Sequence, residues 1–441
     1  MSDFSKKSCD LLIRAGILVT QDAERRVLDD AVIAVEKGRI AAIGSHAELG
    51  AYHAARMLDL RKCLVMPGLV NAHTHVAMTF MRGLADDLPL MEWLTNHIFP
   101  REKHLTAELV EAASLLGCAE MIRTGTTAFA DMYLLEDAVA AAVDASGLRA
   151  LLGEGIFMFP SPAYGTADEA FALVREQHSR YGEHPRIRVG VMPHSVYTTT
   201  PELLLRCKEL SRELALPLYI HLAETESETA ASLEKHGERP VAYCDGLSLL
   251  DSSCTIAHGV TLNDAELDLL AKAGVKVVHN PKSNMKLASG VAPVTGMLSR
   301  GMLPGLGTDG AASNNSLNMF AEMSMCALLH KLTSADPTVC PAGAVLDMAT
   351  LGGAAALGWP GLGQLIAGGP ADLIALDLES PNLQPLYEPV SHIVYAASGH
   401  EVRLCMVDGS ILYEDGNYTR LDYPLLLKEA DKLKRWVLRH H

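Results

Sequence analysis

The sequence predicts an α/β protein: a (β/α)8 TIM-type barrel with a small β-sandwich domain formed by both chain ends. Two observations carry this prediction. Strand-like and helix-like segments alternate through the middle of the chain, and strand-like segments of similar texture occupy both ends. A length of 441 residues is too large for one ordinary domain but sufficient for a barrel and a second, smaller unit.

The middle of the chain contains eight buried-strand candidates, at residues 69–76, 126–132, 149–157, 187–195, 216–224, 254–260, 275–281 and 303–310. Segments with helical spacing lie between most of them, at residues 108–125, 168–182, 201–214 and 263–274. Eightfold alternation is typical of a barrel, which we place at residues 67–367. A doubly wound nucleotide-binding sheet is disfavoured because the chain has neither a GxGxxG nor a GxxxxGK[ST] loop.

Both ends of the chain read as short strands separated by turns. Apolar and polar residues alternate at 10–20, 31–44 and 56–68, and again at 371–378, 392–398 and 402–416. We therefore expect residues 1–66 and 368–441 to form one composite β-sandwich domain.

Composition excludes several classes of protein. A formal net charge of −16 argues against nucleic-acid binding, which needs clustered Lys and Arg, but leaves a nucleoside substrate possible. We find no signal peptide and no apolar run near the ~20 residues that span a bilayer. Because none of the nine cysteines forms a CxxC pair, we expect reduced core thiols in a cytoplasmic protein without a membrane partner.

Polar residues interrupt the apolar strands near their carboxyl ends, where barrel enzymes build their active sites. They are His73 and His75 on the first strand, His194, His221 and His258 on the fourth to sixth, and Asp309 on the eighth. Each alone has a structural explanation, as a buried histidine that satisfies a backbone group or as an aspartate in a turn. Together they imply a shared partner, and a divalent metal supplies one. His279 is not assigned to the metal, and His330 is expected to be solvated.

Five motifs together resemble the amidohydrolase superfamily, and within it the 5-methylthioadenosine/S-adenosylhomocysteine deaminases: PGLVNAHTHVAM, HLAET, IAHGV, HNPKSNMKLASG and GTDGAASNN. The resemblance implies one Zn²⁺ per subunit, with Fe²⁺ as the alternative, held by His73, His75, His221 and Asp309. It implies that Glu224 is the general acid/base and also contacts the substrate. It further implies that His258 polarises the attacking water, and that Asp309 also accepts that water's proton.

The resemblance also implies the reaction: hydrolytic deamination of an adenine nucleoside to the inosine analogue and ammonia, by a metal-activated hydroxide. The predicted substrates are 5′-methylthioadenosine, adenosine and S-adenosylhomocysteine, and the predicted assembly is a homo-oligomer, a dimer or tetramer. Residues 80–104 form a long segment after the first strand, in which Trp93 and Glu102 match substrate contacts, as does His194. A carboxylate such as Glu102 can accept both hydrogen bonds of a ribose diol.

One departure concerns the outer end of the substrate. Relatives can carry arginines after the third strand, but here residues 151–171 contain none. This favours methylthioadenosine or adenosine over S-adenosylhomocysteine. Two alternatives remain: an s-triazine, guanine or other aminopurine amidohydrolase on the same scaffold, and a non-catalytic metal-binding protein.

Overall fold

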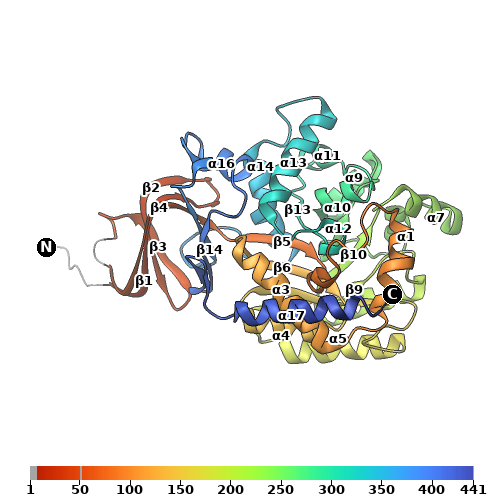
Figure 1. The fold of residues 1–441 in the computed structure, drawn as a ribbon. Coiled ribbons are helices and arrows are strands. Elements are labelled where there is room, and N and C mark those ends of the chain that lie inside the picture. The colour runs from red at the N-terminus through yellow and green to blue at the C-terminus, as the bar shows by residue number, and fades with distance from the viewer. Residues whose placement is uncertain (1–6, 50–51, 441) are drawn as a thin grey trace.

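The computed structural model describes residues 7–49 and 52–440. Figure 1 shows a sheet built from the red and blue ends of the chain beside a larger body of strands and helices from its middle. The sheet has the order β17-β16-β15-β14-β4-β1-β2-β3. Its strands are β1 (Lys7–Val19), β2 (Val27–Glu36), β3 (Arg39–Ser45), β4 (Tyr52–Pro67), β14 (Leu373–Asp377), β15 (Val402–Val407), β16 (Ser410–Glu414) and β17 (Asn417–Tyr418).

The two ends of the chain meet where β4 pairs antiparallel with β14, with Pro67 opposite Leu373. The strands of both ends also share one hydrophobic core, to which Ile13, Ile33 and Leu373 contribute side chains without exposed area. Burying this apolar surface stabilises the pairing of segments that are far apart in sequence.

The eight predicted barrel strands are all present and run parallel. They are β5 (Leu69–Thr74), β6 (Thr126–Tyr133), β7 (Arg149–Ile156), the interrupted fourth strand β8 (Ile187–Val189) and β9 (Met192–Pro193), β10 (Leu218–Leu222), β11 (Cys254–His258), β12 (Lys276–His279) and β13 (Gly305–Leu306). The fourth and fifth strands are joined by a bridge between Ser195 and His221. The barrel closes between β13 and β5, where the Asn71 amide group donates to the Thr308 hydroxyl at 2.8 Å and accepts from the Thr308 N–H at 3.0 Å.

Helices follow the strands and cover the barrel. They are α3 (Ala107–Arg123), α4 (Glu136–Ser146), α5 (Ala167–Tyr181), α6 (Pro201–Leu214), α7 (Glu226–His236), α8 (Pro240–Gly246), α9 (Asp264–Ala273), α10 (Pro281–Lys286), α11 (Val294–Ser299), α12 (Ala311–Asn314), α13 (Met319–Ser334), α14 (Ala342–Asp347), η3 (Met348–Gly352) and α15 (Gly353–Ala356). Side-chain caps fix several starts: Thr166 caps α5 and Asn263 caps α9, each with a glutamate that completes a capping box. Among the described residues, no helix combines the length and apolar character needed to cross a membrane.

The segment between β5 and α3 lies over the mouth of the barrel. It forms η1 (Val76–Met81), α1 (Leu90–Trp93), η2 (Leu94–Ile98) and α2 (Phe99–Glu102). This segment is the long insertion predicted at residues 80–104, and its helices bring side chains to the site described below.

The predicted fold class, a barrel with a small β domain from both chain ends, is confirmed. One element was predicted wrongly: residues 392–398 read as a strand but contribute to the helix α16 (Pro389–Tyr395). Proline at its start favours a helical first turn, and burial of Ile393 and Val394 overrides their β-branched preference. The short helix η4 (Pro381–Leu383) precedes it.

The exact division into residues 1–66 with 368–441, and 67–367, remains a prediction. Part of the C-terminal segment packs against the barrel helices and not against the sheet. Helix α16 packs against α13 and α14, and the final helix α17 (Tyr423–Val437) packs along α3 and η1. Figure 1 shows α17 in dark blue crossing the barrel body. The C-terminal helices therefore connect the sheet region to the barrel.

Candidate active site

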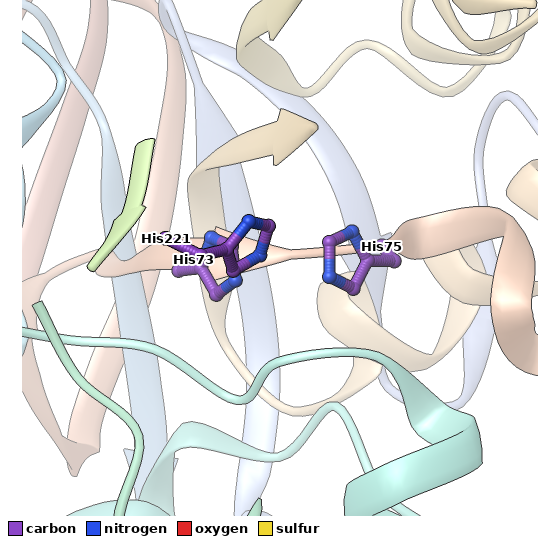
Figure 2. A group of neighbouring side chains, drawn as sticks. All are labelled: His73, His75 and His221. Atoms are coloured by element: carbon purple, nitrogen blue, oxygen red, sulfur yellow. The ribbon is translucent and has the colours of Figure 1, made fainter. Parts of the chain in front are cut away.

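Four predicted site residues meet at the carboxyl ends of the barrel strands. His73 lies in β5 and His75 follows it, His221 lies in β10, and Asp309 follows β13. The imidazole centre of His73 is 5.0 Å from that of His75 and 4.8 Å from that of His221, and Figure 2 shows the three rings grouped together. Asp309 Oδ1 lies 3.2 Å from His75 Nε2 and 3.6 Å from His73 Nε2.

Hydrogen bonds orient the imidazoles. His75 Nδ1 contacts the carbonyl oxygen of Met132, and His221 Nδ1 contacts that of His194 at 2.8 Å. Because a carbonyl only accepts, both Nδ1 atoms donate, so each ring can offer the lone pair of Nε2 to a metal once that nitrogen carries no proton. Nε2 of buried His73 has no hydrogen-bond partner within the described ranges. An unpaired buried nitrogen facing two imidazoles and a carboxylate fits a metal ligand.

Burial and charge set the protonation of this group. Burial and neighbouring imidazoles hold the pKa values of His73 and His221 well below their usual range, so both rings are neutral. Burial opposes protonation of His75 as well, but contact with Asp309 raises its pKa to about 9. Burial would raise the pKa of Asp309, yet contact with His75 holds it well below the usual range. Three imidazoles and a carboxylate are a zinc-type donor set, and an ion here would replace the proton of His75.

Asp309 is held firmly in place. Its Oδ2 accepts hydrogen bonds from the Ser283 hydroxyl at 2.6 Å and the Ser313 hydroxyl at 3.0 Å. Its backbone φ of 60° lies in the left-handed region, where non-glycine residues are uncommon and cluster at functional sites. At Gly307 a Cβ would lie 2.8 Å from the backbone nitrogen of His73, so glycine is needed for the close approach of the two strands.

Glu224 and His258 lie beside the metal-site group. Glu224 Oε2 is 3.9 Å from His258 Nε2, and His258 Nδ1 pairs with Asn284 Oδ1 at 2.9 Å. Burial raises the pKa of Glu224, while His258 opposes part of that rise. The Glu228 carboxylate accepts the N–H groups of Ala223 and Glu224, at 3.1 and 2.6 Å, and so fixes the turn that carries Glu224.

A cavity of about 70 Å³ opens over this group, and every predicted site residue except His73 lines it. Trp93 on α1 is buried, Glu102 ends α2, and His194 follows β9. Burial raises the pKa of Glu102 to about 7, although the nearby Tyr133 hydroxyl lowers it in part. The structure thus brings together all the predicted metal, catalytic and substrate residues around one cavity.

Several residues of the site were not singled out from sequence. Ser283 and Asn284 belong to the quoted HNPKSNMKLASG motif, so a signal was present. Glu228 follows Thr225 at the capping-box spacing, which reads as a helix start rather than a support for Glu224. Tyr133 ends a buried strand and carries no sequence signal for its place in the cavity lining.

One expectation about the other histidines was wrong. His330 was expected to be solvated, but it is 2% exposed. Its Nε2 lies 3.2 Å from Nε2 of buried His279, which does not line the cavity. His330 lies on α13, whose apolar residues are spread around the whole helix, so the sequence did not show that its imidazole packs against buried His279.

Comparison with known proteins agrees with this geometry. The profile of the Amidohydrolase family matches residues 64–412. The chain belongs to the amidohydrolase family. It is 64% identical over 433 residues to the 5-methylthioadenosine/S-adenosylhomocysteine deaminase of Nitratidesulfovibrio vulgaris, covering 98% of each chain. It is 44% identical over 426 residues to the 5′-deoxyadenosine deaminase of Methanosarcina mazei, covering 96% of this chain and 97% of the relative.

A solved structure is also similar to this chain in fold. The crystal structure of an adenosine deaminase from Xanthomonas campestris with bound zinc matches with a TM-score of 0.97 at 38% identity, covering 98% of this chain and 99% of the other. These similarities confirm the predicted family, fold class and enzyme class, a metal-dependent hydrolytic deaminase. The roles of individual residues remain predictions.

Proposed function

We propose that this protein deaminates an adenine nucleoside hydrolytically, giving the inosine analogue and ammonia. The observation that carries the proposal is the single cavity in which Glu224, His258 and Asp309 face Glu102 and Trp93. The lining of the cavity combines groups for activating water with a carboxylate suited to a ribose diol. The candidate substrates are 5′-methylthioadenosine, adenosine and S-adenosylhomocysteine, and the names of the relatives support this class.

His73, His75, His221 and Asp309 would hold one metal ion per subunit, with Zn²⁺ as the expected ion and Fe²⁺ as the alternative. The unpaired Nε2 of His73 and the 3.2 Å contact between His75 and Asp309 support this ligand set. A divalent ion bound there supplies Lewis acidity, which lowers the pKa of a water from ~16 to around 7.

The protein's own groups move the protons. Asp309 accepts the proton of the attacking water, because its carboxylate is ionised and held by Ser283 and Ser313. Glu224, whose pKa burial raises, protonates the purine ring nitrogen, so that the adjacent carbon becomes electrophilic. Glu224 then takes the proton of the hydroxyl that has added to this carbon and passes it to the leaving amine. The proton held by Asp309 returns to Glu224 and restores both carboxyl groups. His258 lies beside the attacking water, where it stabilises the oxygen on which negative charge develops. Ammonia leaves when the bond between carbon and the exocyclic nitrogen breaks.

The outer residues would select the nucleoside. Glu102 accepts hydrogen bonds from the ribose diol, Trp93 packs against the substrate, and His194 contacts it from the fourth strand. His194 suits a neutral contact, since burial lowers its pKa to about 3. The absence of arginine from residues 151–171 supports methylthioadenosine or adenosine over S-adenosylhomocysteine.

The test is a substrate panel with zinc-reconstituted protein, in which ammonia release is measured for adenine nucleosides, guanine, free aminopurines and s-triazines. We expect turnover of adenine nucleosides and little of the others. A preference for triazines or free bases would replace the proposal by the alternative amidohydrolase activity. A metal-loaded protein inert toward every amine would revive the non-catalytic alternative.

Two further predictions concern the setting of the enzyme. We propose a homo-oligomer, a dimer or tetramer, which sedimentation would test. We also propose a cytoplasmic location, supported by the nine cysteines, all of which are buried free thiols.

A further inference from the structure

A second group of side chains with metal-binding atoms lies outside the active site, where a barrel strand meets a covering helix. It consists of His279 at the end of β12 and of Cys326 and His330 on α13. One donor atom of each residue lies within 4.8 Å of the donor atoms of the other two. We call these three residues the inner cluster. None of them lines the active-site cavity, and the proposed deamination does not use them.

A strand and a helix bring the three donors together. Val278 packs with Val70 and Leu151, which belong to other strands, in the interior of the barrel. Because successive side chains of a strand point to opposite faces, the imidazole of His279 points outward, where it meets α13. On that helix the cysteine and the histidine of the inner cluster are four residues apart, so both lie on one face.

The distance between the two imidazoles suits a shared metal ion. Nε2 of His330 lies 3.2 Å from Nε2 of His279. Two nitrogens at about 2.0–2.1 Å from one tetrahedral zinc ion would lie about 3.3–3.4 Å apart. The alternative is a hydrogen bond between the rings, which leaves Nδ1 of His279 without a partner among the described residues and gives Cys326 no role. Bonds from both rings and the sulfur to one cation would offset the burial of all three side chains.

The protonation of the inner cluster also suits a metal ion. Burial lowers the pKa of His330 to about 4, and burial together with His330 holds the pKa of His279 well below its usual range. Both rings are therefore neutral at pH 7, and each has a lone pair to offer. Burial, followed by Cys340 and Glu322, raises the pKa of Cys326 well above its usual range. A bound cation would displace the thiol proton, as it does at zinc–cysteine sites.

The charged neighbours do not oppose a cation. Glu322 lies one helical turn before Cys326, and its carboxylate accepts hydrogen bonds from the Asn314 amide at 2.8 Å and from a backbone N–H at 3.2 Å. Negative charge there favours a cation nearby. The ammonium group of Lys331 is engaged by three backbone carbonyls. Cys340, which is 2% exposed and acts electrostatically on Cys326, is a candidate for a fourth donor.

We propose that the inner cluster binds one divalent cation of the zinc class, in addition to the ion of the active site. His279 and His330 supply neutral nitrogens and Cys326 supplies a thiolate, so the ion joins β12 to α13. Strand β12 leads into α10, which carries Ser283 and Asn284, so the ion stabilises the support of the active site and takes no part in its chemistry. With three identified donors against four, the inner cluster fills after the active site.

Cobalt distinguishes the two sites. Co²⁺ bound to a thiolate absorbs in the near ultraviolet by charge transfer from sulfur, and the active-site donors contain no sulfur. The full chain would be produced in zinc-depleted medium with Co²⁺, so that the enclosed cluster can fill as the chain folds. We expect two ions per chain and a charge-transfer band. One ion per chain without this band would overturn the proposal and leave a hydrogen bond between the two rings.

Matched variants assign the band to the inner cluster. Cys326→Ala should lose the band and one ion per chain. Cys207→Ala is the control, because it removes a thiol of another helix that is also 0% exposed, and it should keep both. A band that survives Cys326→Ala would contradict the ligand set. If Cys326→Ala does not fold, His330→Gln replaces it and should also lose one ion per chain.

The two metal sites can be tested separately. His221→Ala should lose the active-site ion and the deaminase activity but keep the charge-transfer band and one ion per chain. Loss of the band in this variant would contradict an independent inner site. A wild-type protein that deaminates nucleosides with one ion per chain and no band would refute the inner site alone. Absence of turnover in a protein with two ions and the band would refute the proposed function alone.

Discussion

The two ends of the active-site cavity are built differently. At the metal end, His73, His221 and Asp309 lie on or shortly after strands and are buried. His221 is held by the carbonyl of His194, and Asp309 is held by the Ser283 hydroxyl on α10. At the mouth, Trp93 and Glu102 lie on the short helices α1 and α2 of a long segment. Rigid strand ends fix groups that must meet one metal ion, whereas the mouth can vary with the substrate without disturbing the barrel.

This difference predicts two kinds of mutational effect. Changes at the metal end should lower turnover of every substrate by a similar factor. Changes at the mouth should alter the order of substrates, with a smaller loss.

The largest effect is expected for Glu224→Gln. Glutamine keeps the size of the side chain but cannot carry the proton, so kcat should fall by about 10²–10⁴-fold for all nucleosides. Zinc content should stay unchanged, because Glu224 is not among the proposed ligands. Steady-state rates and metal analysis of the same sample test this, and a variant with the parental kcat would rule out the acid/base role.

The next effect is expected for Asn284→Ala, which removes the nearer partner of His258 Nδ1 and leaves only the Asn280 amide nitrogen at 3.3 Å. Without it the imidazole can turn or change tautomer, and kcat should fall by about 10–100-fold with little change in KM. Asn284→Asp keeps an oxygen acceptor and should recover part of the rate. Equal losses in both variants, accompanied by a raised KM, would indicate a general structural defect.

At the mouth, Glu102→Gln should weaken binding of the ribose diol by about 10-fold or more, because a charge-assisted hydrogen bond becomes a neutral one. The pH dependence gives a second test. Since burial raises the pKa of Glu102 to about 7, the carboxyl is protonated below that pH and ionised above it. The KM for adenosine should therefore fall as pH rises from 6 to 8, and this part of the profile should vanish in Glu102→Gln. A 2′,3′-dideoxy substrate equally affected by the substitution would contradict the contact.

The smallest effect is expected for Tyr133→Phe. Its hydroxyl lies next to Glu102 and holds the pKa of that carboxyl below the value that burial alone would produce. Removing it should raise that pKa and shift the KM profile of adenosine toward higher pH, with an unchanged KM on the alkaline side of the profile. An unshifted profile would show that Tyr133 acts on Glu102 only as a packing partner.

The same contrast explains what sequence could and could not reveal. The metal end was predictable because strand alternation is local, and histidines that interrupt apolar strands leave a clear mark at His73, His221 and His258. The residues that hold the metal-end side chains in place were harder to predict. Glu228, for example, stands at a spacing typical of an ordinary helix-capping residue. The lining of the cavity mouth depends on which loops lie close together in the folded chain. Glu102 and Tyr133 line the same cavity although they come from segments whose contact no periodicity encodes.

The two wrong predictions, a solvated His330 and a strand at residues 392–398, have the same cause. In both cases the local pattern allowed more than one structure, and packing against the barrel decided between them. Sequence therefore predicted the barrel and its chemistry, while the side chains that face each other across loops and helices required the structure.

The most direct test of the central claim is metal dependence. The protein would be stripped with a chelator, titrated with zinc, and assayed for ammonia release from adenosine, alongside His221→Ala. We predict that activity disappears on stripping, returns in proportion to zinc up to one ion per chain, and is not restored in His221→Ala. Deamination at an unchanged rate by the stripped protein, or full zinc-dependent recovery in His221→Ala, would contradict the account.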